Sequence, residues 1–236
     1  MTPTHFQVSG HTPFTRTHDL DMYQDAPVSG ARKTRSVGEP GKYWPQHATL
    51  KIAVYDADEE ALEKIKVAAS HWQPFINLTF EFVSGEEGDI RISINYRNKE
   101  GGSSAFGTDA MNVPLYSATM ELPSPYDNPR FDAVATHEFG HALGLHHEHQ
   151  HPDRTIDFNT PEIYQHYKYD MSKESILHNI LSPADREKVA YSDYDQTSIM
   201  HYGFKSSVLW NQAEIPWPTQ LSPEDSRFIA SQYPRA

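Results

Sequence analysis

The sequence contains no cysteine among its 236 residues, so disulfide bonds cannot stabilise the fold and the core and any bound metal must do so. It also lacks any stretch near the roughly 20 apolar residues that a membrane-spanning helix needs. Residues 1–30 show no apolar core of the kind found in a secretory signal. Positive charge is scarce as well, with 20 Lys and Arg against 32 Asp and Glu and a formal net charge of -12. This balance argues against nucleic-acid and anionic-membrane partners, because it would repel phosphate groups.

A dense group of histidines lies in the segment THEFGHALGLHH. If this segment is helical, His137 and His141 lie one turn apart on one face, where both imidazoles can bind a single metal ion. Glu138 follows the first of them, so its carboxylate can reach a water molecule at the metal without binding the metal itself. Gly144 is the residue type that ends a helix in a left-handed conformation and turns His147 back towards the same ion. Three neutral imidazoles leave a fourth position for water.

The whole pattern, H-E-x-x-H-x-x-G-x-x-H, is far more specific than H-E-x-x-H alone, which arises by chance in helical, histidine-containing proteins. It is the metzincin signature, and a Met-turn is expected downstream of it. Ser198, Met200 and Tyr202 form an S-x-M-x-Y segment that meets this expectation. The chain therefore resembles the metzincin zinc metallopeptidases, and most closely their astacin-like branch.

The resemblance implies roles for single residues. It makes the three histidines ligands of one catalytic Zn²⁺ and makes Glu138 the general base and acid. It makes Met200 the Met-turn methionine beneath the metal site. It makes Tyr202 the astacin-type tyrosine, which can bind zinc as a further ligand and swing away to stabilise the transition state. Glu148 matches the residue that pairs with the mature N-terminus in astacins.

The sequence departs from the astacin pattern H-E-x-x-R-x-D-R-D after the third histidine. His151 replaces the arginine and Thr155 the last aspartate, whereas Asp153 and Arg154 are kept. The disulfides common in animal astacins cannot form in a chain without cysteine. We therefore interpret the chain as an astacin-like outlier of microbial type. Three further imidazoles lack the ligand spacing and are expected at the surface or around the ligands: His146, His149 and His151.

The periodicity of the first half predicts an α+β fold with a mixed, twisted sheet, a backing helix and an active-site helix. Alternating apolar and polar side chains predict strands, and an apolar stripe at helical spacing predicts the backing helix. The strands are expected at residues 49–55, 78–83 and 89–96, the backing helix at 59–72 and the active-site helix at 131–145.

The resemblance divides the zincin-like catalytic domain, residues 42–236, into two lobes. The sheet and both helices belong to an N-terminal lobe of about residues 42–145. The C-terminal lobe, about residues 146–236, is expected to be mostly irregular and to contain the Met-turn and a closing helix. Pro223 is expected at the first position of that helix.

Residues 111–120, MNVPLYSATM, are predicted to form a further strand before the active-site helix. In metzincins the corresponding edge strand runs antiparallel to the bound substrate. The resemblance thus assigns peptide binding by strand addition to four residues of this stretch: Tyr116, Ser117, Ala118 and Thr119. The alternative is an ordinary edge strand in which Pro114 prevents aggregation. The preceding segment GGSSAFG lacks the pattern of a phosphate-binding loop and is predicted to be a simple loop.

Residues 1–41 are rich in Thr, Pro, Gly, His and Asp without a sustained period, which is typical of a flexible arm. The alternative is a pro-segment that lies along the active-site cleft and inhibits the enzyme. Asp19, Asp21 and Asp25 are candidate zinc-binding residues of such a segment, although they lack the F-x-G-D context of astacin pro-segments. The basic run at residues 31–35 is a candidate site for proteolytic trimming.

The predicted function is that of a zinc-dependent endopeptidase in which the metal activates a water molecule and Glu138 moves the protons. Tyr202 would donate a hydrogen bond to the developing oxyanion. Two alternatives stay open: a catalytically inactive, zinc-bound module that binds peptides, and a matrixin-like metzincin whose Met-turn tyrosine is not a ligand. The intact Glu138 argues against the first. Protein or peptide substrates and secretion are expected, although these residues show no signal peptide.

Overall fold

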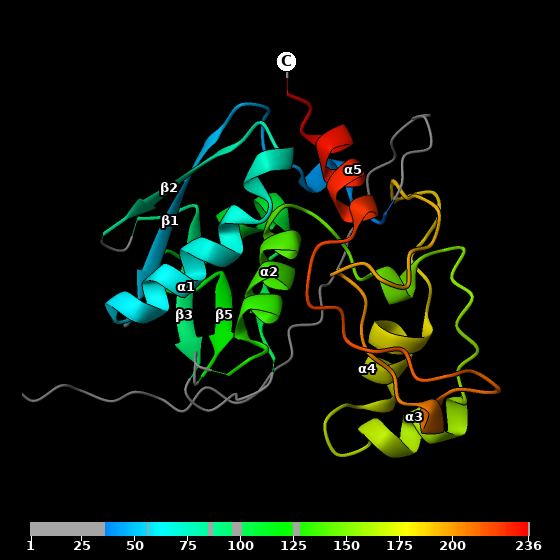
Figure 1. Ribbon diagram of the computed structural model, residues 1–236. Helices are drawn as coiled ribbons and strands as arrows, with labels where there is room; N and C mark the ends of the chain where they lie inside the picture. The colour runs from blue at the N-terminus through cyan, green and yellow to red at the C-terminus, as the bar shows by residue number, and fades with distance from the viewer. Residues whose placement is uncertain (1–35, 56, 85–86, 96–100, 125–127, 236) are drawn as a thin grey trace, which may run out of the picture.

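A sheet in the strand order β2-β1-β3-β5-β4 forms the N-terminal lobe (Figure 1). Strand β1 pairs in parallel with β2 and β3, β3 pairs in parallel with β5, and β4 pairs antiparallel to β5. The strands span Thr49–Tyr55 (β1), Thr79–Val83 (β2), Ile90–Asn95 (β3), Ser103–Ser104 (β4) and Met120–Pro123 (β5). This computed structural model describes residues 36–55, 57–84, 87–95, 101–124 and 128–235. The mixed sheet and the first three predicted strands are confirmed, with ends shifted by a residue.

Two helices pack side by side against this sheet (Figure 1). Helix α1, Glu59–Ser70, begins at Asp58, whose side chain accepts a hydrogen bond from the backbone N–H of Ala61. Helix α2, Phe131–Ala142, contains the first two histidines of the motif. The buried Trp72 joins the helices, because its indole N–H donates to the carbonyl of Thr136 on α2 at 2.9 Å. The apolar stripe of α1 thus fixes the position of the histidine-bearing helix.

The strand predicted over residues 111–120 is wrong. A 3₁₀ helix covers Gly107–Asn112, turns and bends fill the rest, and Met120 alone belongs to a strand. The buried guanidinium of Arg91 gives the physical reason. It donates to backbone carbonyls at 2.9 to 3.3 Å, so these carbonyls face one side chain instead of a neighbouring strand. The carbonyls belong to Val113, Pro114 and Ser117.

The residues assigned to substrate binding in that stretch therefore form no edge strand. Tyr116 is 86% exposed in a turn, and the buried hydroxyl of Thr119 accepts from the backbone N–H of Arg91. Ser117 and Ala118 lie in the irregular segment between them. The edge strand next to β5 is β4, inside the segment GGSSAFG that was predicted to be a loop.

The C-terminal lobe has little regular structure, as predicted. It contains helix α3, Thr160–Tyr167, and helix α4, Lys173–Ile176, which continues into a π-helical turn at Leu177–Leu181. These elements surround a small apolar cluster made of Ile163, Ile176, Ile180, Phe204, Val208, Leu209 and Ile215.

The closing helix α5 spans Pro223–Gln232, so the prediction of Pro223 at its first position is confirmed. Ser222 and Asp225 form a capping box at its start. Its apolar side chains join the core of the N-terminal lobe rather than the C-terminal cluster. Tyr233 secures this return, because its hydroxyl donates to the carbonyl of Leu143 at 2.9 Å. The end of the chain thus holds the turn that follows α2.

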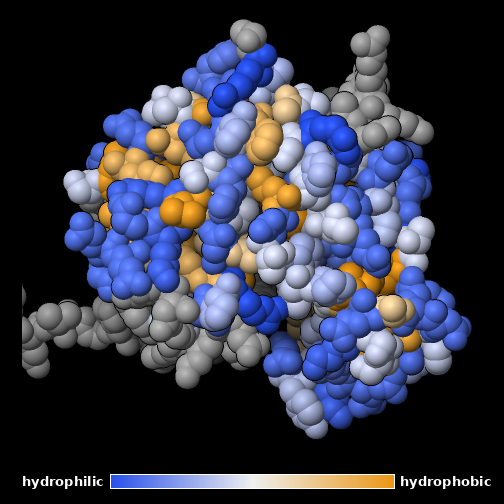
Figure 2. Space-filling model, in the orientation of Figure 1, coloured by the Kyte–Doolittle hydropathy of each residue, from blue (hydrophilic) through white to orange (hydrophobic). Residues whose placement is uncertain are grey.

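The face of the molecule in Figure 2 is mostly hydrophilic, with small apolar patches. Within the described residues, every helix is too short or too polar to cross a membrane.

Candidate metal centre and active site

The turn after α2 brings the third histidine back towards the first two. Gly144 has φ +92°, and the N–H of Leu145 donates to the carbonyl of Gly140 at 3.0 Å, which closes the helix end. A Cβ on Gly144 would lie 2.8 Å from Cδ1 of Tyr43. Both the backbone conformation and the close packing therefore require glycine at the residue that reverses the chain before His147.

We expect Gly144→Ala to lower the free energy of unfolding by about 2 kcal/mol, because alanine is strained at this positive φ and meets the Tyr43 ring. The displaced turn should also weaken metal binding through His147. Chemical denaturation and metal titration would measure the two effects. Gly41→Ala is the matched control, since a Cβ there meets nothing within 4 Å, and an equal loss in both variants would contradict the argument.

Three imidazoles converge at this turn. One ligand nitrogen from each of His137, His141 and His147 lies within 4.8 Å of the others, and Nε2 of His141 is 3.0 Å from Nε2 of His147. Two nitrogens bound to one tetrahedral zinc at 2.0–2.1 Å are about 3.3 Å apart. Nδ1 of His137 donates to the carbonyl of Ile199 and Nδ1 of His141 to that of Leu145, each at 2.7 Å. These bonds leave the Nε2 lone pairs facing the shared space, so the residues fit a metal ion.

Burial keeps these imidazoles neutral. It lowers the pKa of His137 to about 4 and the pKa values of His141 and His147 well below the ordinary value, with repulsion between the imidazoles as a smaller cause. A neutral imidazole is the form that binds a metal ion.

Glu138 is a buried carboxyl group beside the triad. It is 4% exposed, and its Oε2 has no hydrogen-bond partner in the described part of the chain. Burial raises its pKa to about 8, although a bound cation nearby would lower it. A Cβ on Gly102, which precedes β4, would lie 2.8 Å from Oε1 of Glu138. The carboxyl group thus lies between the histidines and the sheet edge.

The segment with Met200 and Tyr202 lies under and beside the triad. The Met200 thioether packs against Gly140 of α2, at the place where a Cβ would fall. The Tyr202 ring is 4.3 Å from the ring of His147 and 6.0 Å from that of His137. Burial raises the pKa of its hydroxyl, with the charge of Glu138 as a smaller cause.

Comparison with known proteins decides the family. The model of the Astacin peptidase family matches residues 36–215. The chain belongs to the astacin family. The match begins a few residues before residue 42, where the sequence suggested that the resemblance starts. The matrixin-like alternative is thereby excluded.

Solved structures and curated relatives agree with this assignment. A structure of myroilysin is 31% identical, with a TM-score of 0.79 over 85% of this chain and 100% of that one. The hatching enzyme HCE-1 of Oryzias latipes shares the fold, at 19% identity and a TM-score of 0.53 over 83% of this chain and 96% of that one. Zinc metalloproteinase dpy-31 of Brugia malayi is 27% identical over 79% of this chain, and nas-38 of Caenorhabditis elegans 26% over 78%. The chain spans less than a third of these two relatives, 29% and 23% of their length.

The residues that follow the third histidine, where the astacin pattern continues, fold back into the C-terminal lobe. His149 and His151 are fully buried, and each Nε2 donates to a backbone carbonyl, of Asn179 at 2.9 Å and Ser192 at 2.8 Å. His151, which stands in place of the family's arginine, thus bonds to the backbone. The ring of His146 contacts that of Phe106 at 4.4 Å. None of these three histidines belongs to the group of converging ligand nitrogens.

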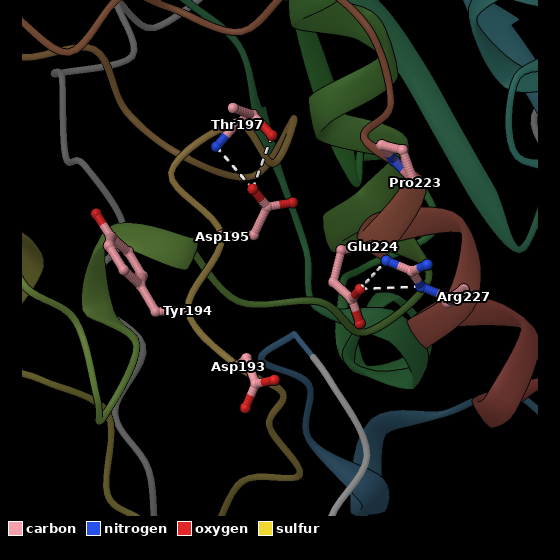
Figure 3. Close-up of a pocket in the computed structure, with 7 residues that line it drawn as sticks. All are labelled: Asp193, Tyr194, Asp195, Thr197, Pro223, Glu224 and Arg227. Atoms are coloured by element: carbon pink, nitrogen blue, oxygen red, sulfur yellow. Dashed lines mark hydrogen bonds and ion pairs between the residues drawn. The ribbon is translucent and has the colours of Figure 1, made fainter.

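Glu148 is fully buried, and its Oε2 has no hydrogen-bond partner among the described residues. Its Oε1 accepts from the backbone N–H of Asp195 at 2.9 Å. Asp195 also lines a cavity of about 300 Å³ together with Glu224 and Arg227 of α5 (Figure 3). Buried next to this acidic cavity, the Glu148 carboxyl has a pKa well above its usual range.

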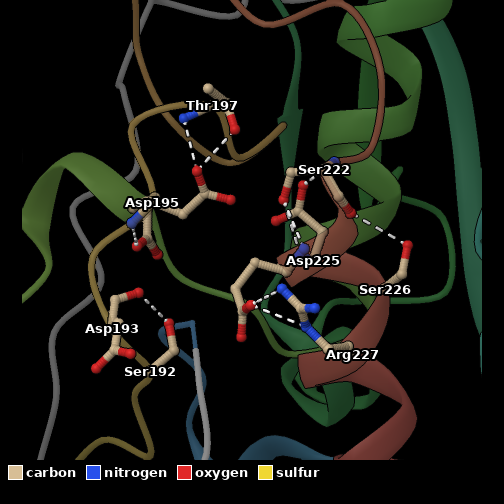
Figure 4. A network of polar contacts seen from close by, with 10 residues as sticks. Ser192, Asp193, Asp195, Thr197, Ser222, Asp225, Ser226 and Arg227 are labelled. Carbon is tan, nitrogen blue, oxygen red and sulfur yellow. Dashed lines mark hydrogen bonds and ion pairs between the residues drawn. The ribbon is translucent and has the colours of Figure 1, made fainter.

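The same region ties α5 to the segment that contains Met200 (Figure 4). Asp225 accepts hydrogen bonds from the hydroxyl of Ser198 at 2.6 Å and the backbone N–H of Ile199 at 2.8 Å. Ile199 is the residue whose carbonyl accepts from His137. The capping residue of α5 therefore supports a metal-ligand candidate through one intervening residue.

Proposed function

We propose that this astacin domain is a zinc-dependent endopeptidase that hydrolyses peptide bonds in proteins. The observation that carries the proposal is the convergence of three neutral imidazoles beside the buried carboxyl group of Glu138. The nitrogen spacing and the two fixed tautomers suit Zn²⁺. Zinc, when bound, supplies a Lewis acid that activates water and polarises the scissile carbonyl.

The residues of this chain then do the proton chemistry. Glu138 accepts a proton from the attacking water and passes it to the leaving amine. Tyr202, kept protonated by burial, donates a hydrogen bond to the developing oxyanion. The substrate adds as an antiparallel strand to the outer edge of β4, and the contact between Gly102 and Glu138 supports this position.

Hydrolysis of a quenched fluorogenic peptide, with and without a chelator, tests the proposal. We expect zinc-dependent cleavage that a chelator abolishes and added zinc restores. Peptide binding without cleavage, at one bound zinc per chain, would instead establish the inactive binding module.

Tyr202→Phe is expected to lower kcat by about 10²-fold, because it removes one donor to the oxyanion. KM and the zinc content should change little, since the ring stays in place. Steady-state kinetics and metal analysis of the purified variant would measure this. A changed KM with an unchanged kcat would assign Tyr202 to substrate binding instead.

We propose further that removal of the N-terminal arm matures the enzyme. Residues 1–35 of the arm, with the three candidate aspartates and the basic run, lie outside the described residues. Support comes from Glu148, whose buried Oε2 lacks a partner among the described residues and would be neutralised by an ammonium group, as in other astacins. Gly38, close to the basic run, pairs with Ala190 of the C-terminal lobe.

A chain that begins at Ser36 should therefore show at least about tenfold higher kcat/KM than the full chain. A tenfold gain corresponds to about 1.4 kcal/mol of added stabilisation of the transition state. Peptide kinetics of both forms would measure the difference. Glu148→Gln should remove the gain in the shorter form. Equal activities of the two unaltered forms would dismiss maturation by trimming. Secretion stays a prediction, to be checked by detecting the protein outside the cells that make it.

A further inference from the structure

A cation–π contact joins the two lobes beside the candidate active site. The guanidinium of Arg130, at the start of α2, lies over the ring of Trp217 at 5.4 Å. Trp217 belongs to the C-terminal lobe, packs on Gly203, and its ring is 5.2 Å from that of Tyr202. The ring is 48% exposed, and Arg130 is exposed as well. An open aromatic and cationic surface therefore adjoins the proposed oxyanion donor.

Arg130 has no acidic partner in the described part of the chain, in contrast to two other exposed arginines of this acidic protein. Arg186 pairs with Asp153, and Arg227 pairs with Glu224. The guanidinium has five N–H donors in a planar fork that fits a carboxylate, and its stacking on an indole leaves these donors available at the ring edge. The chemistry of this surface thus favours a carboxylate supplied from outside the chain.

The chain direction of the proposed peptide substrate determines which side of the scissile bond faces the surface formed by Arg130 and Trp217. Gly102 lies against Glu138, and Phe106 lies 4.9 Å from the ring of His141, so β4 and α2 run in the same direction. A peptide antiparallel to β4 therefore runs towards the start of α2, and its residues after the scissile bond approach Arg130.

The distance between Glu138 and Arg130 along α2 can be expressed as a number of substrate residues. Arg130 precedes Glu138 by eight helical positions, which at about 1.5 Å each is roughly 12 Å. An extended peptide advances about 3.3 Å per residue. With the reach of the arginine side chain, the guanidinium faces the second to fourth residue after the scissile bond.

We propose that Arg130, stacked on Trp217, selects substrates that carry an acidic side chain two to four residues after the scissile bond. The inference rests on the proposed peptidase function and names a substrate feature of the same site. The carboxylate pairs with the guanidinium, and the indole face supports the aliphatic part of the substrate side chain.

Matched fluorogenic peptides test this assignment. Pairs that differ only by Glu or Gln would be compared at the second, third and fourth positions after the cleaved bond. We expect the Glu peptide to have about fivefold higher kcat/KM at one of these positions, the upper range for an exposed ion pair. The ratio should shrink as ionic strength rises. Arg130→Gln should bring the ratio to one, and Arg130→Glu should favour a Lys peptide instead.

Lys66→Gln is the control. Lys66 is another cation over an aromatic ring, that of Phe82 at 6.0 Å, on the opposite edge of the sheet from β4. This variant should keep the preference for the Glu peptide. An equal fall of the Glu-to-Gln ratio in Lys66→Gln and Arg130→Gln would show a general charge effect and overturn the assignment. A ratio of one at all three positions in the active, unaltered enzyme would overturn it as well. If no peptide is cleaved, the peptidase proposal fails, and equal dissociation constants for the Glu and Gln peptides would then refute the role of Arg130 separately.

Discussion

Glu138→Ala is expected to lower kcat/KM by roughly 10²-fold to 10⁴-fold, the usual contribution of general acid–base catalysis. Zinc content should stay at one ion per chain, because Glu138 is not among the converging ligand nitrogens. Stability should not fall, since the carboxyl group is buried, has one oxygen without a partner in the described part of the chain, and gains nothing from being ionised there. The combination of lost turnover, retained zinc and retained stability identifies a proton carrier rather than a structural residue.

The pH dependence of stability gives a second measure of the same group. In the zinc-free chain the folded-state pKa of Glu138, about 8, lies above its ordinary value of 4.5. The folded state therefore binds more protons than the unfolded state between these values, and the contribution of Glu138 to stability is lost as the pH rises through them. Glu138→Gln should remove that loss while also lowering activity. Glu162→Ala, an exposed glutamate on α3, is the control for both measurements. Zinc-dependent activity near the unaltered level in Glu138→Gln would refute the assignment.

The parts of the molecule that local spacing dictates were predictable. The ends of β1 follow from the alternation of apolar and polar side chains. His137 and His141 share a helical face because one turn separates them. The chain reversal at Gly144 follows from its residue type. Pro223 at the start of α5 is a local signal of the same kind. In each case the residues that determine the structure are neighbours in the sequence.

Structure that depends on distant partners was missed. The two residues of β4 show no period, and only their pairing with β5 makes them a strand. Residues 111–119 show a strand-like pattern, but Arg91, far away in the sequence, takes up the carbonyls that a strand would need. The contact between Arg130 and Trp217 likewise joins two lobes and leaves no signal in either segment. The metal site was predictable because its motif is local, whereas the surface that would select substrates was not.

Removal of zinc should produce the largest combined loss of activity and stability. A ligand that binds only the folded chain stabilises it by about 4 kcal/mol at a free concentration 1,000 times its dissociation constant. In a chain of this size that shifts the melting temperature by roughly 10 °C. A chelator should thus abolish peptide hydrolysis and lower the melting temperature together, and one equivalent of zinc should restore both. His141→Ala should behave like the chelated protein even with zinc in excess, whereas His166→Ala, an exposed histidine on α3, should not.

Acid should reproduce the loss of zinc because the ligands bind it only as neutral imidazoles. Burial holds the folded-state pKa of His137 at about 4, below the ordinary 6.5, so between these values the unfolded state binds more protons and stability falls as the pH falls. Zinc affinity and melting temperature should decline together from about pH 6.5 downwards, which titrations at fixed ionic strength would measure. Zinc retained at full stoichiometry below pH 4, or activity that survives complete chelation, would contradict a site built from these three histidines.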